Sequence, residues 1–222
     1  MNNYSGDTTV VDTGMAFLYR KYNNDLIPVD TNIFYQYGYY WFTQIREGDY
    51  IVKVGLSENS LNFNSHATSY HENAFRWDNA NILHLNDTNY FVNVDMIELQ
   101  GVGQGPGSIS GFLSISEKDF INTALVSEVE ILLLDANDNP LTFTITDETG
   151  NFAFGNIPLG SYKLYAEATG YISFVVSVYL DENNQTITDI NLELYEQTVG
   201  TEEYFEKETT IGNIYPNPVK NE

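Results

Sequence analysis

The feature that most constrains the fold of this chain is an internal repeat with a constant offset, in which the second half of the chain matches the first without a gap. Its identical pairs place glycines where turns are expected and aromatic residues at alternating positions, as in a β structure. These pairs are Pro28 with Pro140, Ile33 with Ile145, Gly38 with Gly150, Phe42 with Phe154, Ile45 with Ile157, Gly48 with Gly160 and Tyr50 with Tyr162. Similar residues also coincide, namely Phe17 with Val129, Tyr19 with Ile131, Tyr40 with Phe152 and Val52 with Leu164. The sequence therefore predicts two copies of one β unit.

The periodicity of apolar residues supports the same interpretation. Apolar and polar residues alternate over residues 142–146, 152–154, 162–166, 172–178 and 190–194, which is the pattern of half-buried strands. No stretch of ten or more residues has the 3.6-residue period of an amphipathic helix. The fold class that we predict is all-β, with two tandem antiparallel β-sandwich domains of the Ig-like or prealbumin-like kind.

Glycines spaced two residues apart suggest a boundary between the two copies. They occupy Gly101, Gly103, Gly105 and Gly107, beside Pro106. A phosphate-binding loop would need a different spacing, so we favour a linker. The predicted organisation is domain 1 over residues 1–100 with an insertion at 61–80, a linker at 101–107, domain 2 over 108–196, an acidic linker at 197–210 and the start of a further domain at 211–222.

The composition excludes several classes of protein. Nine Lys and Arg residues against 31 Asp and Glu residues leave a net charge of −22, which disfavours nucleic acids and anionic membranes as partners. The absence of cysteine excludes disulfides, thiolate catalysis and Cys-type zinc sites. No apolar run reaches the roughly 18–20 residues of a spanning helix, so we expect no membrane insertion. Residues 1–30 lack the profile of a signal peptide.

Residues suited to catalysis are sparse. His66 and His71 share one loop at a spacing of five, which differs from the helical i, i+4 spacing of zinc ligands. Solvated loop histidines are the favoured interpretation, with a metal site that includes Glu72 as the alternative. The segment 107–111 has Ile109 where a nucleophile elbow needs serine. We therefore expect that the chain is not an enzyme.

The aromatic residues of the first copy suggest a binding surface. If Tyr40 and Phe42 lie on one strand and face the core of the domain, the residues of the other parity lie on the outer face of that strand. Exposed aromatic rings can stack on sugar rings, so these residues are carbohydrate-binding candidates. An outer face covered by the 61–80 insertion or by a neighbouring domain is the favoured alternative. The candidates are Tyr35, Tyr37, Tyr39, Trp41 and, from the insertion, Trp77.

Residues 150–164 read Gly-Asn-Phe-Ala-Phe-Gly-Asn-Ile-Pro-Leu-Gly-Ser-Tyr-Lys-Leu. Preceded by an Asp/Asn-rich turn at 135–139, this segment resembles carboxypeptidase-regulatory-like, SdrD-B-like and CNA-B-like domains. The resemblance covers residues 108–196 and implies a prealbumin-type β-sandwich of about seven strands. Family members usually serve as spacers, stalks or accessory modules, so the resemblance implies a non-catalytic role.

Two further segments resemble parts of secreted surface proteins of Bacteroidetes. Residues 65–80 resemble a segment common in these proteins, with Thr68, Tyr70, Trp77 and Ala80 in register. Residues 211–222 contain Ile-Tyr-Pro-Asn-Pro and resemble the opening of a type IX secretion C-terminal sorting domain. These resemblances imply a fragment of a larger protein that is exported through the outer membrane to the cell surface.

Some SdrD-B-like relatives bind calcium through Asp-rich loops, so the resemblance also implies a candidate metal site. An EF-hand is excluded because Pro140 and Thr146 occupy positions that need glycine and glutamate. The favoured interpretation is an Asx turn without an ion, and calcium is the one cofactor that we consider. The candidate calcium ligands are Asp135, Asn137, Asp138 and Asp147.

The sequence analysis thus leads to two functional hypotheses. The first is a non-catalytic spacer or accessory region for adhesion or structural interaction, whose partners are other domains of the parent protein or a surface protein. The second is a carbohydrate-binding module attached to a secreted polysaccharide-degrading enzyme, whose partner is a glycan.

Overall fold

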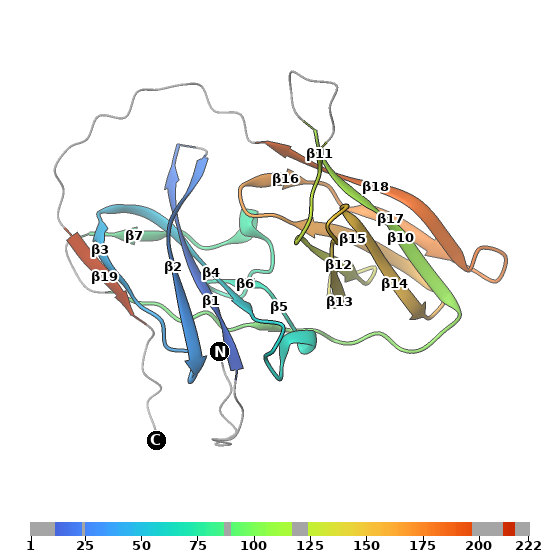
Figure 1. Ribbon diagram of the computed structural model, residues 1–222, viewed down its shortest axis with the longest axis horizontal. Coiled ribbons are helices and arrows are strands. Elements are labelled where there is room, and N and C mark those ends of the chain that lie inside the picture. The colour runs from blue at the N-terminus through green and yellow to red at the C-terminus, as the bar shows by residue number, and fades with distance from the viewer. Residues whose placement is uncertain (1–11, 24, 87–89, 117–123, 197–210, 216–222) are drawn as a thin grey trace. The chain divides into compact units, whose positions relative to one another are not determined.

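A computed structural model describes residues 12–23, 25–86, 90–116, 124–196 and 211–215. The chain forms two compact units, one of residues 1–97 with 198–222 and the other of residues 98–197. The described residues form strands, connected by turns and two short 3-10 helices, so the all-β prediction is confirmed (Figure 1). None of the helices in the described ranges has the length and apolar character needed to cross a membrane.

The larger sheet of the first unit is built on a long antiparallel hairpin. β1 (Asp12–Tyr22) pairs with β2 (Asp25–Gln36) on one side and with β4 (Gly48–Leu56) on the other. The short strands β6 (Ser69–Tyr70) and β7 (Leu83–Leu85) both pair with β4. Alternation of buried and more exposed side chains along β1 gives the sheet one core-facing side.

A second sheet of the first unit joins segments that are far apart in the sequence. It has the order β3 (Phe42–Arg46), β19 (Ile211–Tyr215) and β8 (Tyr90–Phe91). Side chains from β1, β3 and β4 form the core, together with residues next to β8. The predicted insertion at 61–80 holds η1 (Phe63–Ser65), β5 (His66–Ala67), β6 and η2 (Trp77–Asn79), and β5 pairs with β9 (Ile97–Glu98).

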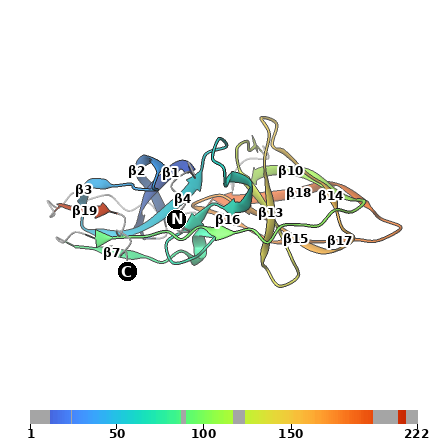
Figure 2. The same cartoon turned by 90° about the horizontal axis from the view of Figure 1, so that it is seen from below.

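The second unit is a sandwich of two sheets (Figures 1 and 2). In one sheet, β10 (Gly107–Ser116) pairs with β14 (Asn151–Ile157), β18 (Thr186–Glu196) and β11 (Ala124–Leu125), and β18 also pairs with β16 (Tyr171–Ser173). The other has the order β13 (Pro140–Ile145), β12 (Glu130–Leu134), β15 (Gly160–Glu167) and β17 (Val176–Leu180). Ile109 and Leu113 of the first sheet share one core with Ile131 and Leu164 of the second.

The two units repeat the same arrangement around one central strand. β1 lies between β2 and β4, as β12 lies between β13 and β15. Leu18 is opposite Val52 in the first unit, and Leu133 is opposite Leu164 in the second. Val52 and Leu164 are partners in the sequence repeat, whereas the same offset assigns Glu130, and not Leu133, to Leu18. The offset of the sequence repeat therefore holds for β4 and β15, but not for β1 and β12.

This difference corrects part of the predicted repeat. The predicted pairing of Tyr19 with Ile131, and of Phe17 with Val129, is wrong because Ile131 faces the core while Tyr19 packs in a cluster outside it. The reason is the length of the hairpin, since eleven residues lie between Leu18 and its partner Asp30 on β2, but eight lie between Leu133 and its partner Thr142 on β13. A hairpin that is shorter by three residues in the second unit shifts the alignment of the first strand by three positions and reverses its side-chain parity.

The glycines predicted to form a linker pack along the second unit instead. The amides of Gln100 and Gly101 donate to the carbonyls of Pro140 and Leu141, at 3.1 and 2.9 Å. The amide of Gly105 donates to the carbonyl of Asn156 at 3.0 Å, and a Cβ on Gly105 would lie 2.4 Å from the Cα of Pro158. These glycines allow close backbone approach, and the division between the two units falls at residues 97–98.

Candidate functional site

The predicted aromatic candidates of the first unit lie where β2 ends and the chain turns toward β3. We call Tyr35, Tyr37, Tyr39 and Trp41 the aromatic surface. Their exposed fractions are 65%, 52%, 51% and 53%, and the rings of Tyr37 and Tyr39 are 6.3 Å apart between centroids. The prediction that these residues share one strand is wrong, because β2 ends at Gln36 and β3 begins at Phe42.

Positive φ angles explain this break in the strand. Gln36 has φ 52° and Gly38 has φ 68°, both in the left-handed region that ends extended structure. The amide of Tyr37 donates to the carbonyl of Tyr35 at 2.6 Å, which closes a tight turn. The aromatic surface is therefore presented by a turn and the segment after it, and not by the flat face of a strand.

Tyr40 and Phe42 face the core, as predicted, and hold this segment in place. Both side chains are buried, and their ring centroids are 5.8 Å apart. The hydroxyl of Tyr40 donates to the carbonyl of Val92 at 2.7 Å. Burial raises the pKa of Tyr40 well above its ordinary value, so the hydroxyl stays protonated and remains a donor.

Trp77 does not join the aromatic surface. It lies in η2 and packs on a cluster formed by Ile51, Tyr70 and Ala74, which also contacts Leu26. Leu26 is at the far end of the β1–β2 hairpin from Tyr35, since they pair with Lys21 and Thr13 respectively. Eight residues of β1 correspond to about 26 Å. The hairpin thus separates the fifth candidate from the other four.

The first of the predicted calcium-binding segments is a closed Asx turn between β12 and β13. The Oδ1 atom of Asp135 accepts the amides of Asn137 and Asn139, at 2.7 and 2.9 Å. Its Oδ2 atom accepts the side-chain amide of Asn139 at 2.9 Å. These bonds, led by the side-chain amide of Asn139, lower the pKa of Asp135. Asp138 forms an ion pair with Lys163 at 2.7 Å.

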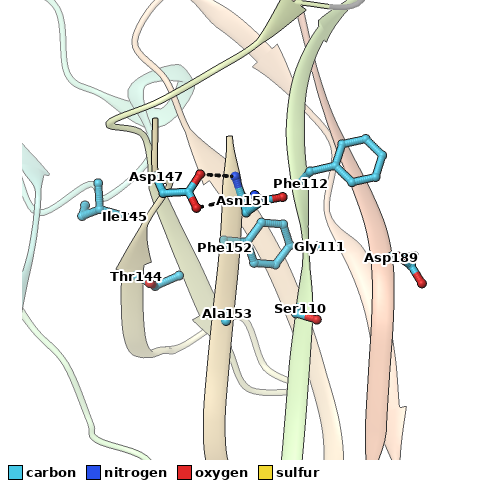
Figure 3. A pocket seen from close by; sticks show the side chains of 10 residues that line it. All are labelled: Ser110, Gly111, Phe112, Thr144, Ile145, Asp147, Asn151, Phe152, Ala153 and Asp189. Atoms are coloured by element: carbon cyan, nitrogen blue, oxygen red, sulfur yellow. Dashed lines mark hydrogen bonds between the residues drawn. The ribbon is translucent and has the colours of Figure 1, made fainter. Parts of the chain in front are cut away.

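A second Asx turn connects β13 with β14 (Figure 3). The Oδ1 atom of Asp147 accepts the hydroxyl and the amide of Thr149, both at 2.8 Å, and the amide of Asn151 at 2.9 Å. The bond from the Thr149 hydroxyl is the main cause of a lowered pKa for Asp147. The carboxylate therefore orders the turn by binding donors of its own loop.

The structure does not bring the four predicted calcium ligands together. Asp135, Asn137 and Asp138 precede β13, whereas Asp147 follows it, and the six residues of β13 span about 20 Å. Across the described ranges, no group of three or more His, Asp or Glu side chains is arranged to hold a metal ion. A single site made from all four residues is thus wrong, while calcium binding at one turn alone stays a prediction.

Sequence reasoning missed a shallow hollow on the second unit (Figure 3). It has a volume of about 420 Å³ and lies over β10 and β14, with Phe112 and Asn151 among its lining residues. Asp147 lines it from the turn between β13 and β14, and Asp189 lines it from β18. The small residues Ser110, Gly111 and Ala153 form part of the hollow, and their occurrence on adjacent strands was the available sequence signal.

The histidines have separate surroundings rather than one shared site. His66 lies 3.0 Å from the Ser65 hydroxyl, and His71 lies 2.6 Å from the carbonyl oxygen of Asn93. The third, His84, forms an exposed contact of 2.6 Å with Asp49. These contacts, all within the described ranges, are different for each histidine: His66 contacts its sequence neighbour, whereas His71 and His84 contact residues of other segments.

Comparisons with known proteins identify the type of one domain. Residues 118–193 match the carboxypeptidase regulatory-like domain, so the predicted resemblance to that family is confirmed over this part of 108–196. The chain is similar to Colossin-A of Dictyostelium discoideum, with 24% identity over 166 residues. This match covers 67% of the chain and spans 1% of the length of Colossin-A.

Two solved structures are also similar to this chain at low sequence identity. GBS52, the minor pilin of Streptococcus agalactiae, is 14% identical with a TM-score of 0.35, over 88% of this chain and 87% of that chain. BcpA, the major pilin subunit of Bacillus cereus, is 14% identical with a TM-score of 0.31, over 84% of this chain and 60% of that chain. The family match lies within the second unit and is more specific than the other comparisons. The second unit is therefore similar to the carboxypeptidase regulatory-like family.

Proposed function

We propose that this chain is a non-catalytic spacer of a larger protein at the cell surface, in which the second unit carries tension between its two ends. The match to the carboxypeptidase regulatory-like domain supports a non-catalytic module. Export by the type IX route is part of the proposal and rests on the resemblance of residues 211–222 to a sorting domain. Protease treatment of intact cells tests the location, since a surface protein is digested without lysis.

The observation that carries the proposal is the pairing of β10 with β18. These are the first and last long strands of the second unit, and they run parallel, from Ser108 opposite Thr186 to Ser116 opposite Tyr195. The chain thus enters β10 at one end of the pair and leaves β18 at the other. Ten residues of strand separate the two ends by about 33 Å.

This geometry determines how a pulling force acts on the unit. Tension between the two ends slides β10 along β18, so the hydrogen bonds of the pair are loaded together. If both ends were on the same side, the bonds would break one after another at low force. A parallel terminal pair is therefore suited to a segment that carries load between its two ends.

Force spectroscopy of the full chain, attached through Gln104→Cys and Glu196→Cys at opposite ends of the β10–β18 pair, tests this proposal because the force then crosses the second unit alone. Unfolding of residues 107–196 should release a contour length of about 30 nm in one step, because an extended residue spans about 3.3–3.6 Å. The matched control pulls from Gln104→Cys and Glu182→Cys, which lie near the same end of the β10–β18 pair. The chain has no other cysteine, so the attachment is specific. Equal unfolding forces in the two geometries would contradict the proposal.

A second candidate function is carbohydrate binding by the aromatic surface, as part of a polysaccharide-degrading protein. The observation that favours it is the exposure of all four rings, each more than half accessible. Amphipathic aromatic side chains at this exposure offer apolar area to a flat ligand. A glycan array with the wild-type chain and the variant Trp41→Ala tests it, with Tyr179→Ala as the control for an exposed tyrosine elsewhere. Binding that survives Trp41→Ala would exclude this surface.

A further inference from the structure

The middle strand of the second sheet of the first unit comes from the far end of the sequence. β19 pairs antiparallel with β3, where Ile211 is opposite Arg46, and parallel with β8, where Ile214 is opposite Tyr90 (Figure 1). Within the described ranges, β3 and β8 have no strand partner other than β19. Residues 211–215 thus fill a position between two strands that do not pair with each other. We call this position the strand slot.

The second unit shows which strand normally occupies such a position. There, β10 pairs antiparallel with β14, with Gly107 opposite Ile157 and Ile109 opposite Phe154. In the first unit, Gly212 is opposite Ile45 and Ile214 is opposite Phe42. The acceptor residues Ile45 and Phe42 are the partners of Ile157 and Phe154 in the sequence repeat.

The parallel neighbour follows the same rule. β10 runs parallel to β18 in the second unit, and β19 runs parallel to β8 in the first. β10 directly precedes the other strands of its own unit, whereas β19 follows both units in the sequence. The first unit therefore takes, from a distant segment, a strand that the second unit takes from its own beginning.

The walls of the strand slot are held by residues of the first unit itself. Tyr40, just before β3, donates its hydroxyl to the carbonyl of Val92, just after β8, at 2.7 Å. Phe42 and Ile45 of β3 and Val92 belong to the same buried core. The two walls are thus connected by a buried contact that does not involve β19.

We infer that the strand slot is a strand-acceptor site, filled by residues 211–215 of the same chain and open to the same strand of a second copy. Exchange between copies forms the same backbone hydrogen bonds, so its cost is low. The fourteen residues 197–210 separate β18 from β19 and can span at most about 50 Å. A tethered strand has an effective concentration of about millimolar, so exchange requires high protein concentration or joint refolding.

Cysteine cross-linking of the full chain tests this inference, because the natural chain has no cysteine. Arg46 and Ile211 are directly opposite in the register, and Arg46 is exposed. Directly opposed Cβ atoms are about 4.5–5.5 Å apart, close to disulfide range. Two chains of different tagged length, one with Arg46→Cys and one with Ile211→Cys, are refolded together at high concentration and then oxidised.

The expected result is a mixed disulfide dimer of the two tagged chains, in excess over dimers of either chain alone. The matched control replaces Ile211→Cys with Gly212→Cys, the next position along the strand, where alternation reverses the face, and should lose the mixed dimer. The double variant Arg46→Cys, Ile211→Cys in one chain reports pairing within a chain. If the double variant cross-links within one chain but the two single variants form no mixed dimer, the inference of exchange is overturned. If neither experiment gives a cross-link, the strand slot itself is overturned.

Discussion

Tyr50 and Tyr162, which are partners in the sequence repeat, make the same hydrogen bond in the two units. The hydroxyl of each donates to the carbonyl four residues upstream, Arg46 at 2.8 Å and Pro158 at 2.9 Å. Between donor and acceptor lies a glycine with positive φ, 146° at Gly48 and 156° at Gly160. The tyrosine thus closes the turn that only glycine makes without strain, and the repeat preserves both parts.

This contact predicts the effect of removing either hydroxyl. Tyr162→Phe should lower the free energy of unfolding by about 1 kcal/mol, since the carbonyl of Pro158 loses its donor. Tyr50→Phe should have an effect of similar size in the first unit. Urea unfolding at neutral pH measures both, with the exposed Tyr179→Phe as the control. If both variants unfold at the same urea concentration as the wild type, these hydrogen bonds do not contribute to the free energy of unfolding.

The buried Tyr40 predicts loss of stability at alkaline pH. Its pKa is raised by burial, so the folded state keeps its proton where the unfolded state loses it. Stability is then complete below the ordinary tyrosine value of about 10 and falls above it, by about 1.4 kcal/mol per pH unit for one group. Urea unfolding between pH 9 and pH 11.5 should show a shallower decline for Tyr40→Phe than for wild type. The exposed Tyr35→Phe is the control, and parallel slopes for all three proteins would contradict the assignment.

The Asx turn at Asp147 predicts that stability falls at acid pH, the opposite direction from the effect of Tyr40. Hydrogen bonds lower its pKa in the folded state, so its contribution is present above the unfolded value of about 3.9 and is lost as the pH falls below it. Asp147→Ala should melt at a lower temperature than wild type at pH 7, and the difference should narrow as the pH decreases through 4. The neighbouring exposed Glu148→Ala is the control. A constant difference at all pH values would exclude the charged carboxylate as the cause.

Close approach of two strands at Gly111 predicts a steric effect. A Cβ at this position would lie 2.0 Å from the carbonyl oxygen of Ile190, where β18 carries an extra residue relative to β10. Gly111→Ala should therefore destabilise the second unit by about 1–3 kcal/mol, as expected for overpacking. Gly155→Ala is the matched control because a Cβ there meets nothing within 4 Å. Denaturant unfolding distinguishes them, and equal midpoints would mean that β18 moves away freely.

Several features of the fold follow from local sequence alone. The period of two placed Tyr40 and Phe42 in the core and Trp41, between them, outside it, because neighbouring side chains of an extended segment point to opposite faces. The glycine pairs of the repeat marked turns because their backbone conformation excludes most other residues. For the same reason, the Asx turn at Asp135 was predictable from its short polar side chains.

Only the tertiary structure decided the features that depend on which strands meet. The length of the hairpin aligned Leu18 with Leu133 and not with Glu130, and the direction of β13 separated Asp135 from Asp147. The position of residues 211–215 between β3 and β8 depends on partners more than a hundred residues away. A local pattern specifies the face and the turns of a strand, but backbone hydrogen bonds between strands form irrespective of side-chain type. Register and pairing are therefore chosen by the packing of the whole unit.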